Sequence, residues 1–199
     1  MQAEIFFRLV VLVVLGCAFL LSGIYRNKSK GLDIIKDPGQ EEDRTSQMLQ
    51  LGTGMAILVI LILDLFFPQL MGWSRIEIPL WARILGSILM LVFLVWIWWV
   101  YRTLARSIPE TASPADSQAL ITSGPYRWVR HPLYAGVLLL LFSLSLVLED
   151  WLLLVFSVFG TVIFRLLVIP GEEKQLLESF GEEYESYQSR TGALVPWIR

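Results

Sequence analysis

Long apolar runs dominate the sequence and constrain its fold more than any other feature. Five runs stand between polar segments, at 5–25, 51–73, 78–101, 134–148 and 151–169. A helix needs about 20 apolar residues to cross a bilayer. The hydrophobic fraction is 55%, above the range of about 45–50% that is typical of soluble domains. The sequence therefore predicts an all-α integral membrane protein with about five transmembrane helices.

The fourth and fifth runs are joined by only two residues, Glu149 and Asp150. So short a break predicts a tight antiparallel helical hairpin, in which the first arm is slightly short for a full crossing. After Pro170 the chain becomes polar, yet apolar residues recur at helical intervals in the segment GEEKQLLESFGEEYESYQSR. That spacing predicts a C-terminal amphipathic helix, interrupted near Gly181.

Lysine and arginine lie mostly on one side of the predicted spans. They occur in the polar segments 26–50 and 102–132 and in the tail after residue 171, whereas the other side carries Arg75 beside the acidic pair Glu149 and Asp150. The positive-inside rule then places both segments and the tail in the cytoplasm and the amino terminus outside. No basic stretch precedes the first run, so the amino terminus is predicted to be a retained anchor.

One acidic residue, Asp64, falls inside the second run. Counted from Leu51 it lies about 20 Å along a helix, which is nearer the outer face. Arg8 and Arg83 lie at comparable outer depth. Because acids inside a membrane are costly without a partner, we expect Asp64 to form a structural ion pair with one of these arginines.

Several functional classes are disfavoured by composition. Cys17 and His131 are the single cysteine and histidine, so neither a disulfide framework nor a metal site is expected. A net charge of -2 gives no basic field for nucleic acid. The chain also lacks a G-x-G-x-x-G after a strand and a Ser/His/Asp arrangement, so a cofactor would be held by helix ends and loops.

The segment SGPYRWVRHPLY, residues 123–134, places two arginines and the histidine at the start of the fourth run. Two interpretations are open. In one, the segment holds anionic headgroups, and Glu172 and Glu173 merely stabilise the first turn of the tail helix. In the other, the cations and the helix N-terminus hold a carboxylate, while Glu172 or Glu173 takes hydroxyls or an ammonium. The second arrangement suits a zwitterionic, ribose-bearing small molecule.

Two longer stretches resemble a known family. ALITSGPYRWVRHPLYAG, followed by PGEEKQLLESFGEEYESYQSRTGALVPWI, is similar to the isoprenylcysteine carboxyl methyltransferases, in the broad group that includes phospholipid methyltransferases. The resemblance implies a membrane enzyme that binds S-adenosylmethionine in a cytoplasmic pocket and methylates a lipophilic or prenylated substrate from the bilayer. It implies that the cofactor is covered by Gln118, Ala119, Leu120 and Ile121, lined by Tyr126, His131, Pro132, Leu133 and Tyr134, and contacted by Glu172.

We therefore expect a single domain over 1–199, with three spans in 1–101 and the cofactor-binding and catalytic region in 102–199. The chain departs from the family at two positions: Gln118 stands where histidine is common, and Val168 stands where the carboxyl methyltransferases carry arginine. Arg165, three residues before Val168, shares its face if the helix is regular. We hypothesise that Arg165 orients a substrate carboxylate in place of the family arginine.

Other activities remain open from the sequence. A lipid amine would have to lose a proton before attack, for which Tyr134, carboxylates or water are available. Membrane sterol reductases resemble this group in their C-terminal region but bind NADPH, and a non-enzymatic membrane scaffold is a further alternative. Membrane lipids are expected partners, nucleic acid is not, and the oligomeric state is undetermined by the sequence.

Overall fold

The computed structural model describes residues 2–29, 44–106 and 120–196, and within these ranges every regular element is helical. The α-helices there are α1 Gln2–Ser29, α2 Arg44–Phe66, α3 Leu80–Arg106, α4 Pro132–Leu148, α5 Trp151–Ile163, α6 Ile169–Phe180 and α7 Glu182–Arg190. Shorter elements are the 3₁₀ turns η1 Gly72–Ser74 and η2 Gly124–Arg127 and the π-helical segment η3 Phe164–Val168. The predicted all-α class is confirmed.

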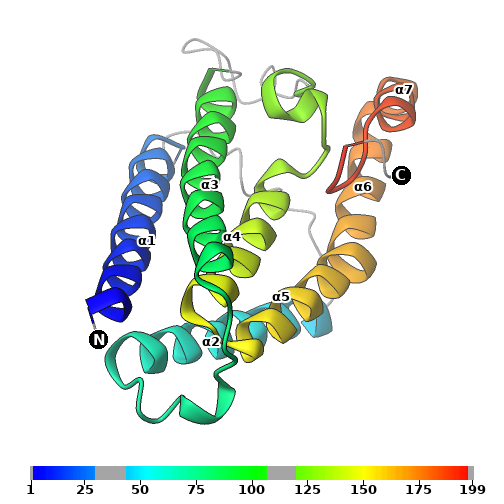
Figure 1. The fold of residues 1–199 in the computed structure, drawn as a ribbon. Helices are drawn as coiled ribbons and strands as arrows, with labels where there is room; N and C mark the ends of the chain where they lie inside the picture. The colour runs from blue at the N-terminus through cyan, green and yellow to red at the C-terminus, as the bar shows by residue number, and fades with distance from the viewer. Residues whose placement is uncertain (1, 30–43, 107–119, 197–199) are drawn as a thin grey trace.

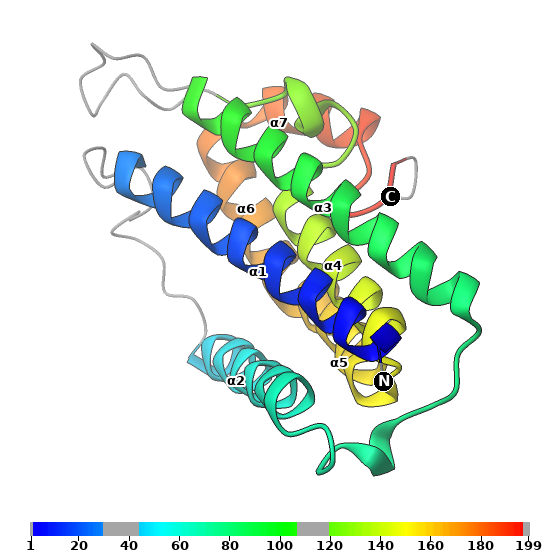
Figure 2. The same ribbon diagram turned by 60° about the vertical axis from the view of Figure 1, so that its left-hand side comes forward.

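Helices α1, α3 and α4 run side by side, and α5 and α6 lie beyond α4 (Figures 1 and 2). Small residues bring α3 and α4 together. A methyl group on Gly86 would lie 2.9 Å from the Cβ atom of Leu146, and one on Gly136 would lie 3.0 Å from the indole of Trp96. Close backbone approach of this kind is how helices associate where surrounding lipid removes the hydrophobic drive. The start of α4 is thereby fixed against α3.

Three helical stretches are long and apolar enough to cross a bilayer: Gln2–Tyr25, Leu80–Arg106 and Trp151–Phe180. Two shorter apolar helices accompany them, Leu51–Phe66 and Pro132–Leu148. The protein is accordingly an integral membrane protein. The predicted second span, 51–73, differs from the structure, where α2 is Arg44–Phe66 and lies across the lower end of the view in Figure 1. Pro68, which has no N–H to donate, follows the end of α2 and favours a turn there.

The predicted hairpin between α4 and α5 is present. Glu149 adopts the left-handed conformation with φ 58°, which reverses the chain after α4. Asp150 caps α5 by accepting a hydrogen bond from the Leu153 N–H at 3.1 Å. The Ser74 hydroxyl donates to the same carboxylate at 2.5 Å. The two-residue connection therefore also fixes the segment between α2 and α3.

Asp64 is fully buried and pairs with Arg75 at 3.4 Å. The expected partners, Arg8 and Arg83, were wrong. The reason is the course of α2: the chain folds back after the helix, so an arginine close in sequence reaches the carboxylate. The side-chain nitrogen of Arg8 instead donates to the Leu65 carbonyl at 3.2 Å.

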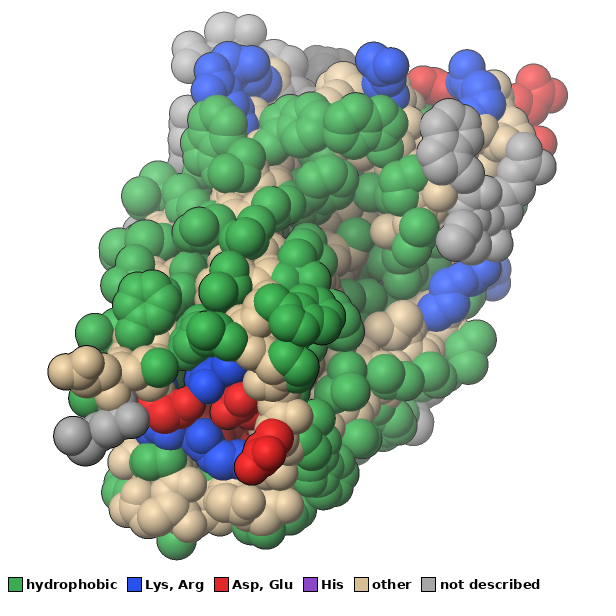
Figure 3. Space-filling view, in the orientation of Figure 1, with side chains coloured by type: hydrophobic (Ala, Val, Ile, Leu, Met, Phe, Trp, Pro, Cys, Tyr) green, Lys and Arg blue, Asp and Glu red, His purple; other side chains and the backbone are tan. Residues whose placement is uncertain are grey.

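Arg83 belongs to the same charged cluster, which Figure 3 shows at the lower left of the molecule. Its guanidinium contacts Glu4 at 2.5 Å and Glu149 at 3.2 Å and donates to the Val147 carbonyl. Arg75 also lies 3.6 Å from Glu4. These contacts tie α1, α3 and the α4–α5 hairpin together at the end of the bundle that we predicted to face outward.

The helix that begins at Trp151 extends beyond the predicted fifth span, 151–169. It continues to Phe180 through η3, where the Ile169 N–H donates to the Phe164 carbonyl in a widened π turn. Pro170, which has no N–H to donate, directly follows this π turn as the second residue of α6. The predicted interruption at Gly181 is confirmed, since α6 ends at Phe180 and α7 begins at Glu182.

Candidate functional site

The loop before α4 is held from both ends. Trp96 on α3 donates its indole N–H to the Pro132 carbonyl at 2.7 Å. At the start of η2, Gly124 has φ 60°, and a methyl group there would lie 2.5 Å from the Thr103 hydroxyl oxygen. Only glycine combines this backbone conformation with so close a neighbour. The segment 123–131 is thus pressed against α3 before α4 begins.

The residues that follow α7 hold the other side of this loop. The Arg130 N–H donates to the Gly192 carbonyl at 2.8 Å, and the His131 N–H donates to the Ala193 carbonyl at 3.0 Å. Val129 and Gly192 form an isolated parallel bridge. Figure 1 shows this return of the chain beside α6, at the end of the molecule opposite the charged cluster of Arg83. The residues that follow α7 therefore bind the loop that precedes α4.

Arg130 binds three parts of the chain at once. Its Nε donates to the Glu173 carboxylate at 2.7 Å, and its Nη1 donates to the carbonyls of Gln188 and Thr191. The Gln188 amide donates to the other Glu173 oxygen at 2.9 Å. The Arg130 side chain is 6% exposed and that of Glu173 is 15% exposed. This buried charge pair joins the loop, α6 and α7 and so fixes their relative positions.

His131 lies against both glutamates of α6. Its Nδ1 is 3.1 Å from Glu172 and its Nε2 is 3.4 Å from Glu173. Burial alone would lower the pKa of this imidazole, but the two neighbouring carboxylates outweigh burial and raise its pKa above the ordinary value. The raised pKa favours a cationic imidazole between two carboxylates.

Tyr134 connects the histidine to the π segment. Its hydroxyl donates to Glu172, so one carboxylate is shared by Tyr134 and His131. Its ring stacks on Phe164 with centroids 4.5 Å apart and lies nearly parallel to the His131 ring at 5.8 Å. The π turn places Phe164 in this column, which agrees with the tendency of π-bulges to occur at functional sites.

Other residues expected at the site take varied positions. Pro132 is buried as the first residue of α4, and Leu133, Leu120 and Ile121 are half-buried. Tyr126 accepts a hydrogen bond at its carbonyl from the Tyr187 hydroxyl, at 2.6 Å. Gln118 and Ala119 lie outside the described residues.

Arg165 does not share a face with Val168. Arg165 is exposed and Val168 is buried, because η3 is a π-helix and three residues in it subtend a different angle from three residues in a regular α-helix. The expected alignment of the two positions is therefore wrong. Within the described residues, Arg165 forms no ion pair or side-chain hydrogen bond.

Sequence reasoning named Glu173 only as an alternative to Glu172 and counted Arg130 only as one of the two arginines of the segment, so it missed their pairing with each other, and it missed Phe164 altogether. The pair of Arg130 and Glu173 had a local signal, because Arg130 directly precedes His131 and Glu173 directly follows Glu172. Two predicted site residues are thus flanked by residues of opposite charge. Phe164 had no such signal, because its contact with Tyr134 depends on a π turn that the sequence pattern does not predict.

The site fits a small polar ligand better than a metal ion. Nε2 of His131 is buried and, although it lies 3.4 Å from Glu173, makes no hydrogen bond within the described residues. The buried Tyr184 hydroxyl also has no hydrogen-bond partner there. Buried orphan groups of this kind normally find a partner. Among the described residues, no group of three or more His, Cys, Asp or Glu side chains is placed to hold a metal. Figure 3 shows a recess on this face between α4 and α6.

The part of the chain that contains this site is similar in sequence to known proteins. A family model described as phospholipid methyltransferase matches residues 81–183, which run from α3 into α7. The chain belongs to this family. Its relatives include protein-S-isoprenylcysteine O-methyltransferases, so the resemblance inferred from the motifs is confirmed.

Three relatives indicate how far the likeness extends. The protein-S-isoprenylcysteine O-methyltransferase of Saccharomyces cerevisiae is 31% identical over 146 residues, covering 72% of this chain and 61% of the yeast protein. A probable enzyme of the same name from Oryza sativa subsp. indica is 31% identical over 158 residues, covering 77% of this chain and 78% of its own. The methanethiol S-methyltransferase of Pseudomonas deceptionensis is 36% identical over 88 residues, covering 44% and 32%. The chain thus spans less than two thirds of the yeast relative's length.

Proposed function

We propose that the protein is an S-adenosylmethionine-dependent membrane methyltransferase whose substrate is a lipophilic carboxylate of the isoprenylcysteine type. The observation that carries the proposal is the convergence of His131 and Tyr134, at the start of α4, on Glu172 at the start of α6. This convergence lies inside the region matched by the phospholipid methyltransferase model. Relatives named as methyltransferases for prenylated proteins and for methanethiol support methyl transfer as the reaction class.

S-adenosylmethionine, when bound, supplies a methyl group on a positively charged sulfur. Direct displacement requires the protein mainly to align donor and acceptor and to exclude water. Each oxygen of Glu172 has a further lone pair for a ligand hydroxyl or ammonium. The Leu133 N–H, in the first turn of α4, and the imidazole of His131, whose raised pKa favours its charged form, suit a ligand carboxylate. Tyr126, Pro132 and the half-buried Leu120 and Ile121 would supply the surrounding wall. We further propose that this pocket opens to the cytoplasm.

Arg165 remains our candidate for orienting the substrate. It is an exposed cation next to Phe164, it has no ion-pair partner among the described residues, and Phe164 stacks on Tyr134. A guanidinium in that position can reach toward the bilayer surface and bind a carboxylate through two N–H donors. A carboxylate attacks without first losing a proton, so the proposed reaction requires no general base. The role of Tyr134 is instead to hold Glu172 through its hydroxyl group.

The substrate proposal is tested with Arg165→Ala and Arg165→Lys, each assayed for cofactor binding and for methyl transfer to a prenylcysteine acid and to phosphatidylethanolamine in parallel. Lys174→Ala is the matched control, because it removes an exposed cation elsewhere on the same helical stretch. We expect Arg165→Ala to lose acid methylation while cofactor affinity is kept. Full activity of Arg165→Ala, or activity on the amine alone, would contradict the assignment.

A further inference from the structure

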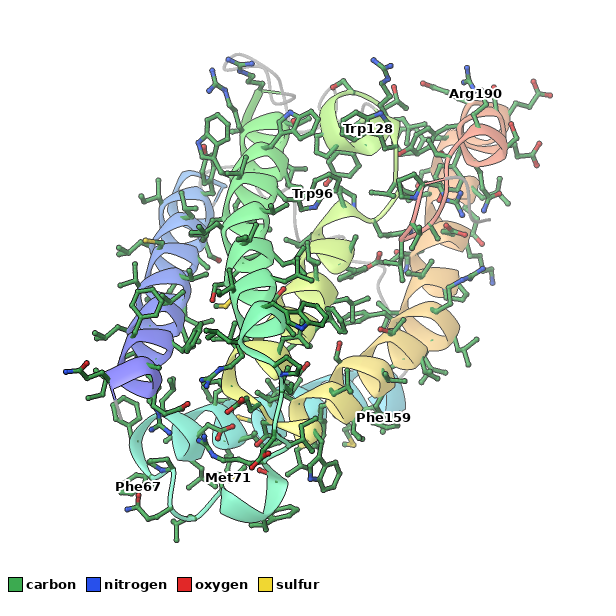
Figure 4. All side chains as sticks on the ribbon, in the orientation of Figure 1. Phe67, Met71, Trp96, Trp128, Phe159 and Arg190 are labelled. Carbon is green, nitrogen blue, oxygen red and sulfur yellow. The ribbon has the colours of Figure 1, made fainter. Side chains whose placement is uncertain are left out.

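A groove lined by three tryptophans runs along α3. Trp96, Trp99 and Trp128 line it together with Ile88, Leu91, Val92 and Val95, and its volume is about 430 Å³. Trp128 stacks on Trp96 with centroids 6.5 Å apart and meets Trp99 edge-on at 5.2 Å. Figure 4 shows the labelled Trp96 and Trp128 close together near the loop end of the bundle. The groove is therefore built by α3 and by Trp128, the residue that directly follows η2.

Two cations stand at the loop end of this tryptophan groove. Arg127 directly precedes Trp128, and Arg106 lies seven residues after Trp99 on α3, hence on the same helical face. Both side chains are exposed, and in the part of the chain that the structure describes neither forms an ion pair or a side-chain hydrogen bond. Figure 3 shows lysine and arginine side chains along the upper rim, above the apolar surface.

Polar donors and apolar walls follow one another along the groove. The Trp96 N–H is already used by the Pro132 carbonyl, whereas no described residue accepts from the indole N–H of Trp99 or Trp128. An indole offers an apolar ring with a polar donor at one edge, which suits the boundary between lipid chains and headgroups. From Val92 toward the loop end, the groove thus presents an apolar wall, then indole donors, then two exposed cations.

A second apolar groove provides the contrast. It lies between α1 and α3, has a volume of about 690 Å³ and is lined by residues such as Phe6, Val13 and Ile84. Arg83, on the same stretch of α3, is already bound to Glu4 and Glu149. That groove lacks tryptophan in its wall, and the nearby cation is neutralised. Of these two grooves in the described part of the chain, the tryptophan groove is therefore the one that complements an anionic ligand in charge.

The tryptophan groove is separate from the proposed cofactor site. Gly136 of α4 faces Trp96, whereas Tyr134 of the same helix faces Phe164 and Glu172. The two sites therefore lie on opposite sides of the first turn of α4, with Pro132 between them. A ligand in the groove does not occupy the cofactor site.

We propose that the tryptophan groove binds one anionic phospholipid, with an acyl chain along Val92 and Val95 and the phosphate between Arg106 and Arg127. This inference goes beyond the proposed methyl transfer and does not depend on it. Each basic residue near an anionic lipid contributes about 1 kcal/mol, or about fivefold in affinity. Trp96 lines the groove and also donates to the Pro132 carbonyl. A lipid in the groove therefore contacts a residue that holds the loop before α4.

The test is native mass spectrometry of the whole protein released from detergent and titrated with phosphatidylglycerol or phosphatidylcholine. Wild-type protein should retain one phosphatidylglycerol in preference to phosphatidylcholine. The double variant Arg106→Gln with Arg127→Gln should bind phosphatidylglycerol about 25-fold more weakly, because each cation contributes about fivefold. Trp128→Leu should weaken both lipids alike.

Two variants serve as controls in the same titration. Phe6→Leu alters the contrasting groove, and Arg190→Gln removes an exposed cation of α7; both should leave retention unchanged. Melting temperatures measured alongside show that each variant is folded. Equal retention of the two lipids by the wild type, equal loss in the control variants, or a second protein copy in place of the lipid would each overturn the proposal.

Discussion

Replacing Arg130 by methionine should destabilise the protein because it leaves the Glu173 carboxylate buried without its main partner. Breaking a buried charge pair from one side costs about 3–5 kcal/mol. His131 and Gln188 still face Glu173, at 3.4 and 2.9 Å, so the lower end, about 3 kcal/mol, applies. For a domain of this size the melting temperature falls by about 2–4 °C per kcal/mol, and a drop of about 6–12 °C is expected.

The double variant Arg130→Met with Glu173→Gln separates the charge effect from lost packing. Removing the stranded charge should recover about 0.5–3 kcal/mol relative to the sum of the single variants, the usual range for residues in contact. Thermal unfolding in detergent, followed by tryptophan fluorescence, gives all four melting temperatures. If Arg130→Met melts like the wild type, or if the double variant is no better than additive, the reasoning about this buried pair is refuted.

Three further results are expected. Because the pKa of His131 is raised, its contribution to stability is complete below about 6.5 and is lost as pH rises through the raised value; melting curves should show this decline in the wild type and a flat profile in His131→Gln. Gly124→Ala should lower the melting temperature more than Gly181→Ala, since both have positive φ but only Gly124 faces Thr103; equal shifts would exclude the contact as the cause. Tyr134→Phe keeps the ring stack but removes the bond to Glu172, so binding of S-adenosylhomocysteine should weaken about tenfold with little change in melting temperature.

Much of the fold followed from apolar run lengths and local stops. The hairpin at Glu149 and Asp150 and the break at Gly181 are properties of a few adjacent residues, and each agrees with the structure. The course of α2 did not follow, because a hydropathy pattern gives the length of a helix but not its angle to its neighbours. That angle decided the partner of Asp64.

At the site, sequence reasoning identified residues but not the contacts that hold them. His131, Tyr134 and Glu172 meet as a group, whereas the clamp that positions them involves Arg130 and carbonyls that lie about 60 residues away in the chain. Contacts between residues so far apart in the chain produce no periodic pattern in the sequence. The π turn at Phe164 also has no sequence signature, which explains why the expected alignment of Arg165 was wrong.

The central proposal, that the junction of α4 and α6 binds S-adenosylmethionine, is tested most directly by calorimetric titration of the purified protein with S-adenosylhomocysteine and, in parallel, with NADPH. The account predicts binding of S-adenosylhomocysteine alone, weakened at least about tenfold, or about 1.4 kcal/mol, in His131→Ala and in Glu172→Ala. Binding of NADPH would indicate the reductase alternative, and binding of neither compound would favour a scaffold. Unchanged affinity for S-adenosylhomocysteine in both variants would contradict the assignment of the site.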